Sequence, residues 1–341
     1  MLRQLIYCIG HAFFLIFGLV LFFFTGRNTE RGYQALVFWF CLTKGRSNTL
    51  LVRIQSLFVS RLRDLDRKGL LGEAQNVVRA YLEDLRKKGY VSKNAALSHD
   101  ECDRLIEFAL STPALVRQMD GDQQSRMEQT FVLFDPHNLQ AVRYDYLPQD
   151  LVANPDIQNL MADNSLLALA ESYLGTAPRL DVISMWWHTS FSKTPDSKAA
   201  QLYHFDLDRP RWLKVFIYLT DVGSDNGPHS FIEGSHRIGA IPARFLRRGY
   251  ARLTDREVIG EYGSNREVIF TAPKGTVIVE DTIGLHKGNV VTGSPRLILQ
   301  LQFSSSLFGT PGYARSRLPQ RRTPELNRMI RSNPIAYQGF L

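Results

Sequence analysis

Three residues of the sequence could together bind one metal ion. His204 and Asp206 lie two residues apart in Tyr-His-Phe-Asp, and His286 follows in Gly-Leu-His-Lys-Gly-Asn. Residues two apart on a β-strand point to the same side, so His204 and Asp206 can reach the same ion. Two histidines and one carboxylate on one face of the ion form a common non-haem Fe(II) site, which leaves further positions open. The pattern therefore predicts an Fe(II) site formed by His204, Asp206 and His286.

A cation follows the second histidine at a spacing that suits a co-substrate contact. Arg296 comes shortly after His286 and opens a strand-like segment. Guanidinium is planar and permanently charged, so it binds a carboxylate through two parallel hydrogen bonds. Near a metal, it could hold the far end of a dicarboxylate whose near end chelates the ion. An arginine at the start of a strand is usually exposed, and the spacing from His286 is what favours a role in the site.

The segment 212–220 has one polar and one apolar face if it forms a strand. Alternation puts Lys214, Phe216, Tyr218 and Thr220 on one face, while leucine, valine and isoleucine occupy the other. The cation, phenol and hydroxyl suit either the polar interior of a barrel or a surface in contact with solvent. The strand alone does not decide between these two interpretations.

The elements that must position these residues change in type along the chain. Helical patterns come first, at 75–89 and 98–110, with short helices beginning near Pro155 and Asn164. Strand-like segments rich in Val, Ile, Phe, Trp and Tyr follow, at 181–190, 212–220, 267–271, 276–280 and 296–303. Many short strands after a helical first half predict an α+β domain built on a jelly roll.

Short motifs between the predicted ligands follow a definite order. They are His204-Phe205-Asp206, Thr220-Asp221, Asn226-Gly227-Pro228, Gly234-Ser235-His236, His286 and Arg296. In order and spacing this set resembles the phytanoyl-CoA dioxygenase family over roughly residues 89–303. The resemblance implies a double-stranded β-helix, a cupin-like jelly roll with flanking helices, that uses Fe(II), 2-oxoglutarate and O2.

The same resemblance implies roles for individual residues. His204, Asp206 and His286 resemble the iron ligands of the family. Arg296 resembles the residue that binds the distal carboxylate of 2-oxoglutarate, and Tyr218 falls near a position that lines this co-substrate. No further catalytic residue is implied beyond the metal ligands.

The sequence departs from the family pattern at two places near the site. Phe205 stands where the family often has Gln, and Lys287, Gly288 and Asn289 displace the usual small residue and Asn after the distal His. These changes affect the inner wall of the pocket rather than the metal ligands. Halogenating relatives carry a small residue in place of the carboxylate ligand, so the presence of Asp206 favours hydroxylation.

Other polar residues near the motifs allow two interpretations each. His229 follows Asn-Gly-Pro and could face the pocket, and Glu280-Asp281 could support the metal ligands from behind. A turn or the end of a strand explains the same residues equally well. His236 is expected to stabilise its own turn.

The N-terminal segment predicts a membrane anchor. Residues 5–24 are almost continuously apolar, which is about the length that a helix needs to cross a bilayer. No small-residue cleavage pattern of a signal peptide follows. More basic residues follow the segment than precede it, which predicts a single-pass helix with the main domain in the cytoplasm. A first helix buried in the domain is the alternative.

Charge and cysteine content limit the remaining possibilities. The formal net charge is +8, with basic clusters in 25–70 and 311–331 that could bind anionic lipid or simply remain solvated. Nucleic acid is an unlikely partner. Three widely spaced cysteines form neither a disulfide framework nor a zinc pattern.

The expected organisation is an anchor at 1–30, a basic amphipathic helical linker at 31–88, a dioxygenase domain at 89–308 and a basic tail at 309–341.

Together these features predict a membrane-anchored Fe(II)/2-oxoglutarate oxygenase that hydroxylates a small-molecule or lipid-like substrate. The segment 237–266 is expected to cover the barrel mouth, and its seven arginines against three acidic residues favour an anionic substrate or a solvated basic loop. Two alternatives remain at this point: a cupin-like metalloenzyme that does not use 2-oxoglutarate, and a membrane-tethered binding module without activity.

Overall fold

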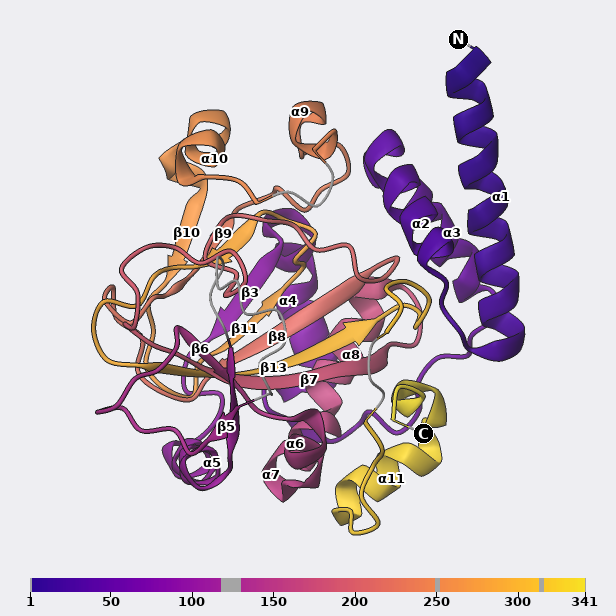
Figure 1. Ribbon diagram of the computed structural model, residues 1–341. Coiled ribbons are helices and arrows are strands. Elements are labelled where there is room, and N and C mark those ends of the chain that lie inside the picture. Colours follow the sequence, from indigo (N-terminus) through magenta and orange to yellow (C-terminus); the bar gives the residue numbers. More distant parts are fainter. Residues whose placement is uncertain (1, 118–129, 249–251, 313–315, 341) are drawn as a thin grey trace.

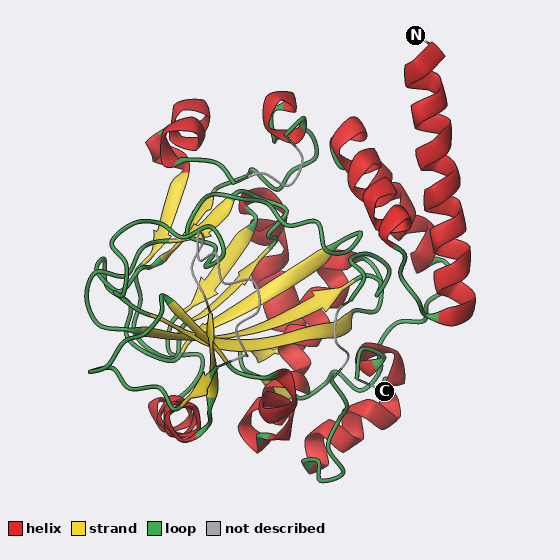
Figure 2. Cartoon of the chain, viewed as in Figure 1, coloured by secondary structure: helices red, strands yellow, loops and turns green. Residues whose placement is uncertain are grey.

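The protein has a mixed architecture of helices around two antiparallel sheets, as Figures 1 and 2 show. The computed structural model describes residues 2–117, 130–248, 252–312 and 316–340. A large sheet of eight strands lies at the centre, and a sheet of three strands lies beside it. This arrangement is compatible with the predicted jelly roll.

The large sheet has the order β3-β11-β8-β13-β7-β6-β4-β5. Its strands are β3 (Tyr90–Lys93), β11 (Val277–Glu280), β8 (Trp212–Tyr218), β13 (Arg296–Ser304), β7 (Arg179–His188), β6 (Arg143–Asp145), β4 (Ala114–Arg117) and β5 (Phe131–Val132). The smaller sheet has the order β10-β9-β12. It contains β10 (Glu267–Phe270), β9 (His229–Ile232) and β12 (His286–Gly288). Outside these two sheets, β1 (Lys68–Gly69) and β2 (Gly72–Glu73) form a separate antiparallel hairpin. All five strands predicted from the sequence are present, with ends shifted by one or two residues.

The helices surround the sheets and add a group at the N-terminus. They are α1 (Leu2–Thr25), α2 (Glu30–Thr43), α3 (Arg46–Ser56), α4 (Ala74–Lys88), α5 (His99–Ser111), α6 (Pro148–Ala153), α7 (Pro155–Met161), α8 (Asn164–Leu174), α9 (Ala243–Leu246), α10 (Asp255–Tyr262) and α11 (Pro324–Ser332). Two 3-10 turns, η1 (Ser264–Arg266) and η2 (Pro334–Tyr337), complete the set. The predicted helix ends are confirmed: Ser98 and Glu101 form a capping box, and Gly89 and Gly175 end α4 and α8 in the left-handed conformation.

The two faces of β8 have different neighbours. Its apolar side chains, Leu213, Val215 and Ile217, belong to the main core, which also includes buried side chains of α4 and α8. The opposite face carries Lys214 and Tyr218, and these side chains are buried too. The polar face therefore points into the space between the two sheets and not to solvent, which decides the question that the strand pattern left open.

The C-terminal segment packs against the same core. Leu326 and Met329 of α11, together with Ala336, Tyr337 and Phe340, are buried among its side chains. The predicted boundary at residue 308 stays a prediction, as do the other two, at residues 30 and 88. The segment 237–266 contains α9 and α10, and Arg244 and Arg248 pair there with Glu261 and Glu257. Part of its positive charge is thus neutralised internally, which weakens the argument for an anionic substrate.

The three N-terminal helices form a group beside the sheet-containing domain, at the right of Figure 1. In the described chain, one helix is long and apolar enough to cross a membrane, over Leu5–Thr25. This helix packs along α2, where a Cβ on Gly18 would lie 3.0 Å from the Gly32 Cα, so only a small residue permits the close approach. In turn α2 contacts the domain, because Phe40 stacks on Phe205 with ring centres 6.4 Å apart.

Candidate active site

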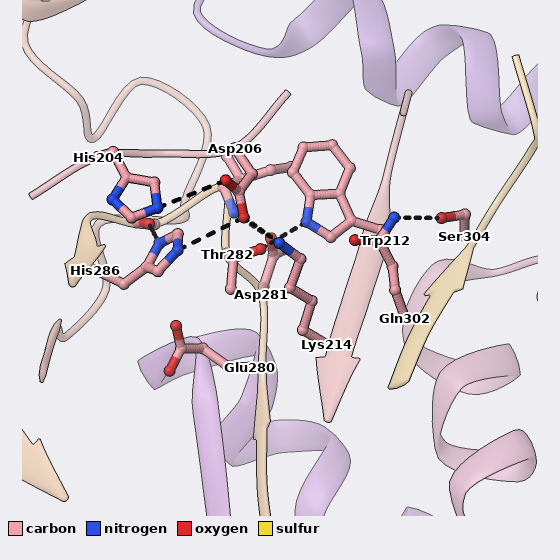
Figure 3. Close-up of polar contacts among 12 residues, drawn as sticks. His204, Asp206, Trp212, Lys214, Glu280, Asp281, Thr282, His286, Gln302 and Ser304 are labelled. Atoms are coloured by element: carbon pink, nitrogen blue, oxygen red, sulfur yellow. Dashed lines mark hydrogen bonds and ion pairs between the residues drawn. The ribbon is translucent and has the colours of Figure 1, made fainter. Parts of the chain in front are cut away.

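Backbone pairing brings the three predicted metal ligands together. The amide of His204 donates to the carbonyl of His286 at 3.0 Å, and the reverse bond measures 2.9 Å. The amide of Asp206 donates to the carbonyl of Thr282 at 2.8 Å, which holds the His-x-Asp segment beside the chain leading to β12. All three side chains are buried and converge on one point, as Figure 3 shows.

The geometry of this cluster fits a metal ion. One ligand atom from each residue can be chosen so that all lie within 4.8 Å of one another. The Nδ1 atoms of His204 and His286 each lie 2.9 Å from a carbonyl oxygen, of Leu202 and Gly284. A carbonyl only accepts, so each Nδ1 carries the proton and each Nε2 keeps its lone pair. The Nε2 atom of His204 lies 3.8 Å from an Asp206 carboxylate oxygen, and that of His286 lies 3.5 Å from the other. A metal ion bound by all three side chains would replace these weak contacts.

The sequence did not predict that Lys214 contacts one of the three proposed metal ligands. Its Nζ donates to Asp206 Oδ2 at 2.5 Å. Burial by itself would raise the pKa of Asp206, but the Lys214 ammonium and the two imidazoles lower it below its usual range. Asp206 is therefore ionised at neutral pH, as a metal ligand must be. The available signal was the alternation in 212–220, which put Lys214 on the same face as Tyr218.

Arg296 is buried on the inner face of the large sheet, with a relative exposure of 1%. Strand pairing places it opposite His188 of β7, and its Nη2 lies 2.8 Å from His188 Nδ1. Among the described residues, Arg296 Nε and Nη1 have no hydrogen-bond partner. Buried donors without acceptors are rare, because each costs free energy unless it is satisfied. The empty side of this guanidinium fits a carboxylate, such as that of 2-oxoglutarate.

Tyr218 lies beside this arginine, as the sequence predicts. The Arg296 guanidinium carbon is 6.0 Å from the centre of the Tyr218 ring. The Tyr218 hydroxyl donates to the carbonyl of Phe270 at 3.0 Å and accepts from the amide of His229. Both of these bonds are to backbone, so the ring is held in place as a wall of the Arg296 pocket.

A second buried polar pair lies near the metal ligands. His229 Nε2 is 3.1 and 3.0 Å from the two carboxyl oxygens of Glu280, and the His229 ring centre is 5.6 Å from that of His286. Burial raises the pKa of Glu280 to about 8 and lowers the pKa of His229 to about 3. Near pH 7 the pair is mainly neutral, with one proton between the two groups. His229 therefore lies beside His286, with Glu280 paired to it, and a role of the two residues at the metal stays a prediction.

Asp281 and His236 bond to parts of the chain outside the ligand cluster. Asp281 accepts a bond of 2.5 Å from the Tyr173 hydroxyl and another from the Ile283 amide. It thereby holds the chain that leads to His286. His236 does not act within its own turn, because its Nε2 bonds to the carbonyl of Arg86 at 3.0 Å and so joins that turn to α4.

The Glu280 carboxyl makes the stability of the iron-free protein depend on pH. Its pKa of about 8 in the folded protein lies above the ordinary value of about 4.5, so folding retains a proton that the unfolded chain releases. The contribution of this carboxyl to stability should therefore fall as pH rises through this interval, by on the order of 2 kcal/mol between pH 6 and pH 8, while buried neutral histidines such as His229 contribute in the opposite direction. Glu280→Gln should abolish this part of the loss.

Denaturant unfolding of the metal-free protein in detergent, at both pH values, measures the effect. The exposed acid Glu83, changed to Gln, is the matched control and should leave the difference between the two pH values as in the wild type. If Glu280→Gln showed the wild-type difference, the carboxyl would be ionised in the folded protein and the neutral pair would be wrong.

Comparison with known proteins extends these observations. The family model of phytanoyl-CoA dioxygenase (PhyH) matches residues 85–296. No curated protein matches the chain significantly in sequence. Among solved structures, HygX from Streptomyces hygroscopicus with nickel and 2-oxoglutarate bound is 16% identical, with a TM-score of 0.49 over 73% of this chain and 93% of that one.

Two further solved structures are similar at the same remote level. The non-heme alpha ketoglutarate dependent carbocyclase SnoK from nogalamycin biosynthesis is 16% identical, with a TM-score of 0.47 over 69% of this chain and 85% of that one. EctD from S. alaskensis with bound Fe is 18% identical, with a TM-score of 0.45 over 78% and 94%. At such values the likeness carries no argument, and the assignment rests on the sequence match. Since this match covers more than half of the chain and every predicted site residue, the protein belongs to the phytanoyl-CoA dioxygenase family and is an Fe(II)/2-oxoglutarate-dependent dioxygenase.

Proposed function

We propose that His204, Asp206 and His286 hold the iron, that Arg296 and Tyr218 bind 2-oxoglutarate, and that the enzyme hydroxylates a small-molecule substrate. One observation carries the proposal. Two buried imidazoles, each tied through Nδ1 to a backbone carbonyl, present their Nε2 lone pairs beside an ionised carboxylate. This is the donor set that Fe(II) takes in oxygenases with open coordination positions.

The strand order supports a double-stranded β-helix as the frame of the site. Between β7 and β13 the chain crosses repeatedly from one sheet to the other, since β7, β8, β11 and β13 belong to the large sheet and β9, β10 and β12 to the smaller one. The bridge between His204 and His286 adds an edge to the smaller sheet. Each sheet then contributes to one enclosed space: the smaller sheet and its edge carry the three proposed ligands, and the large sheet carries Lys214, Tyr218 and Arg296.

Iron, 2-oxoglutarate and O2 together would supply the oxidation of a substrate C–H bond to an alcohol, with 2-oxoglutarate converted to succinate and CO2. The residues of the chain position the metal ligands and 2-oxoglutarate and shield the site from water. Lys214 orients the Asp206 carboxylate and offsets its charge, so that a single geometry is presented. Arg296 fixes the far end of the dicarboxylate, and buried Phe216 and Ile298 on the same inner faces exclude water.

Anaerobic incubation with Fe(II) and 2-oxoglutarate tests the assignment most directly. The complex should develop a visible metal-to-ligand charge-transfer band, and a metabolite screen under air should then find compounds that stimulate succinate release. Iron binding without the band would mean that 2-oxoglutarate does not chelate this iron, and the proposed roles of Arg296 and Tyr218 would be wrong.

We also propose that α1 attaches the enzyme to a membrane, with the dioxygenase domain on the cytoplasmic side. Large apolar side chains are exposed along one side of α1 and at the end of α3. They include Phe23 (81% exposed), Phe24 (78%), Leu57 (79%) and Phe58 (83%). The other side of α1 packs on α2, which is itself joined to the domain. This packing favours a helix that lies in the membrane surface over the single-pass span predicted from the sequence.

Removing the exposed phenylalanines should release the protein from membranes. Burial of one large apolar side chain is worth about 1.5–3 kcal/mol, so Phe23→Ser with Phe24→Ser should weaken partitioning by more than about 100-fold. Flotation with liposomes measures this. The matched control, Leu133→Ser with Phe191→Ser, removes exposed apolar groups from the domain and should float like the wild type. If the Phe23/Phe24 variant still floated and resisted carbonate, α1 would span the bilayer instead.

A further inference from the structure

A second cavity lies away from the metal ligands, where the N-terminal helices meet the dioxygenase domain. Its volume is 260 Å³. One wall is the turn between α2 and α3 with the start of α3, and the facing wall is the turn 234–239, which donates a backbone bond from Gly239 to Lys44. Phe40 lines this cavity and stacks on Phe205, whereas the lining includes none of the three proposed metal ligands. A ligand here would not contact the iron.

The cavity is strongly cationic. Four permanently charged side chains from separate parts of the chain line it: Lys44, Arg86, Arg211 and Arg237. Within the described residues, none of the four has a carboxylate oxygen within 4.0 Å. The acidic residue in the lining, Asp281, is already bound by Tyr173 and by the Ile283 amide. Four cations and one carboxylate leave the lining with a net positive charge, which an anion in the cavity would offset.

Two further features of the lining suit an anion with an apolar part. The first turn of α3 opens into the cavity at Gly45, so the helix dipole adds to the positive field there, although Thr43 Oγ1 accepts one first-turn bond, from the Ser47 amide. Apolar side chains complete the wall: Phe40, Ile238, Ile241, Leu246 and Ile283. Ile238 is itself exposed, and the cavity opens beside the helices that carry the proposed membrane face.

We propose that this cavity binds a phosphate group, and that its ligand is the phosphate-bearing head of an anionic lipid or a soluble phosphorylated molecule of the same chemistry. Arginines grip phosphate with paired hydrogen bonds, and the lysine adds a point charge. The apolar wall would contact the carbon skeleton next to the phosphate. The ligand would thereby hold the turn of α2–α3 against the turn 234–239, and so fix the N-terminal helices on the domain.

Binding can be measured on the full-length protein in neutral detergent, without reference to catalysis. Calorimetric titration would compare phosphatidic acid with phosphatidylcholine in mixed micelles, and glycerol 3-phosphate in free solution. Lys44→Gln with Arg237→Gln removes two exposed cations of the cavity. Arg53→Gln with Lys87→Gln is the matched control, because it removes the same charge from α3 and α4 outside the cavity.

The cavity variant should weaken phosphatidic acid binding by at least about tenfold, while the control variant binds like the wild type. If phosphatidic acid binds more than tenfold tighter than glycerol 3-phosphate, the ligand is a lipid head group. Equal affinity of the two, with the same dependence on the variants, identifies a soluble phosphate. The proposal is overturned if neither phosphate binds, or if both double variants weaken binding equally. Since no iron or 2-oxoglutarate enters the readout, these outcomes do not depend on the catalytic assignment.

Discussion

Replacing His204 or His286 by alanine is expected to remove most Fe(II) binding and all measurable 2-oxoglutarate turnover, while the fold is kept. Each imidazole contributes one of three protein ligands, and even residues behind such ligands are worth about 10–100-fold in metal affinity, so loss of a ligand should cost at least about 100-fold. Iron content after anaerobic reconstitution and succinate release are the two measurements.

Asp206 requires a different substitution. Asp206→Ala would leave the buried Lys214 ammonium without the carboxylate that it contacts at 2.5 Å, and an uncompensated buried charge destabilises the fold. Asp206→Asn keeps a hydrogen-bond acceptor for Lys214 but removes the anionic ligand. His236→Ala, a histidine outside the cluster, is the control and should retain iron. Full iron occupancy and activity in His286→Ala would contradict the proposed metal site.

Arg296→Ala should raise the apparent constant for 2-oxoglutarate by at least about 30-fold, with Fe(II) binding unchanged. Truncating one partner of a buried charge pair costs roughly 2–5 kcal/mol, and a factor of ten corresponds to 1.4 kcal/mol. Burial lowers the pKa of Arg296, but the guanidinium remains the cation of this pocket. Initial rates of succinate formation at varied 2-oxoglutarate measure the change.

Arg296→Lys separates charge from geometry. An ammonium cannot reproduce the planar fork, so only partial rescue is expected. The Fe(II) dissociation constant is the internal control, because Arg296 does not contact the three proposed ligands. If 2-oxoglutarate dependence were unchanged in Arg296→Ala, another cation would have to bind it. Lys214 is a poor substitute, since its ammonium is already held by Asp206.

Local chemistry was sufficient to predict many parts of this protein. The capping box at Ser98 and the left-handed glycines Gly89 and Gly175 end their helices where the sequence predicts, because caps depend on residues within one turn. Alternation over 212–220 separated a core face from a polar face. The three proposed ligands could be found from residue type, order and spacing, because two of them lie two residues apart and the motifs between them resemble a known family. The structure has no full strand at His204 and Asp206, only a bridge from His204 to His286.

Tertiary structure alone decided which groups meet. The contact of Lys214 with Asp206 joins β8 to the segment before it, and that of His229 with Glu280 joins β9 to β11, so no local pattern encodes them. The same holds for the cationic cavity, whose four charged residues come from α4, two loops and the end of α2.

The apolar N-terminal segment shows the same limit. Its length and composition are equally suited to a span and to a helix that lies along a surface, since both bury apolar side chains. The packing of Gly18 on Gly32 and of Phe40 on Phe205 gives α1 one covered and one exposed side, and the proposal of a helix in the membrane surface rests on this packing. Periodicity within a segment is set by its own residues, whereas burial, pairing and charge compensation are set by neighbours that only the folded chain brings near.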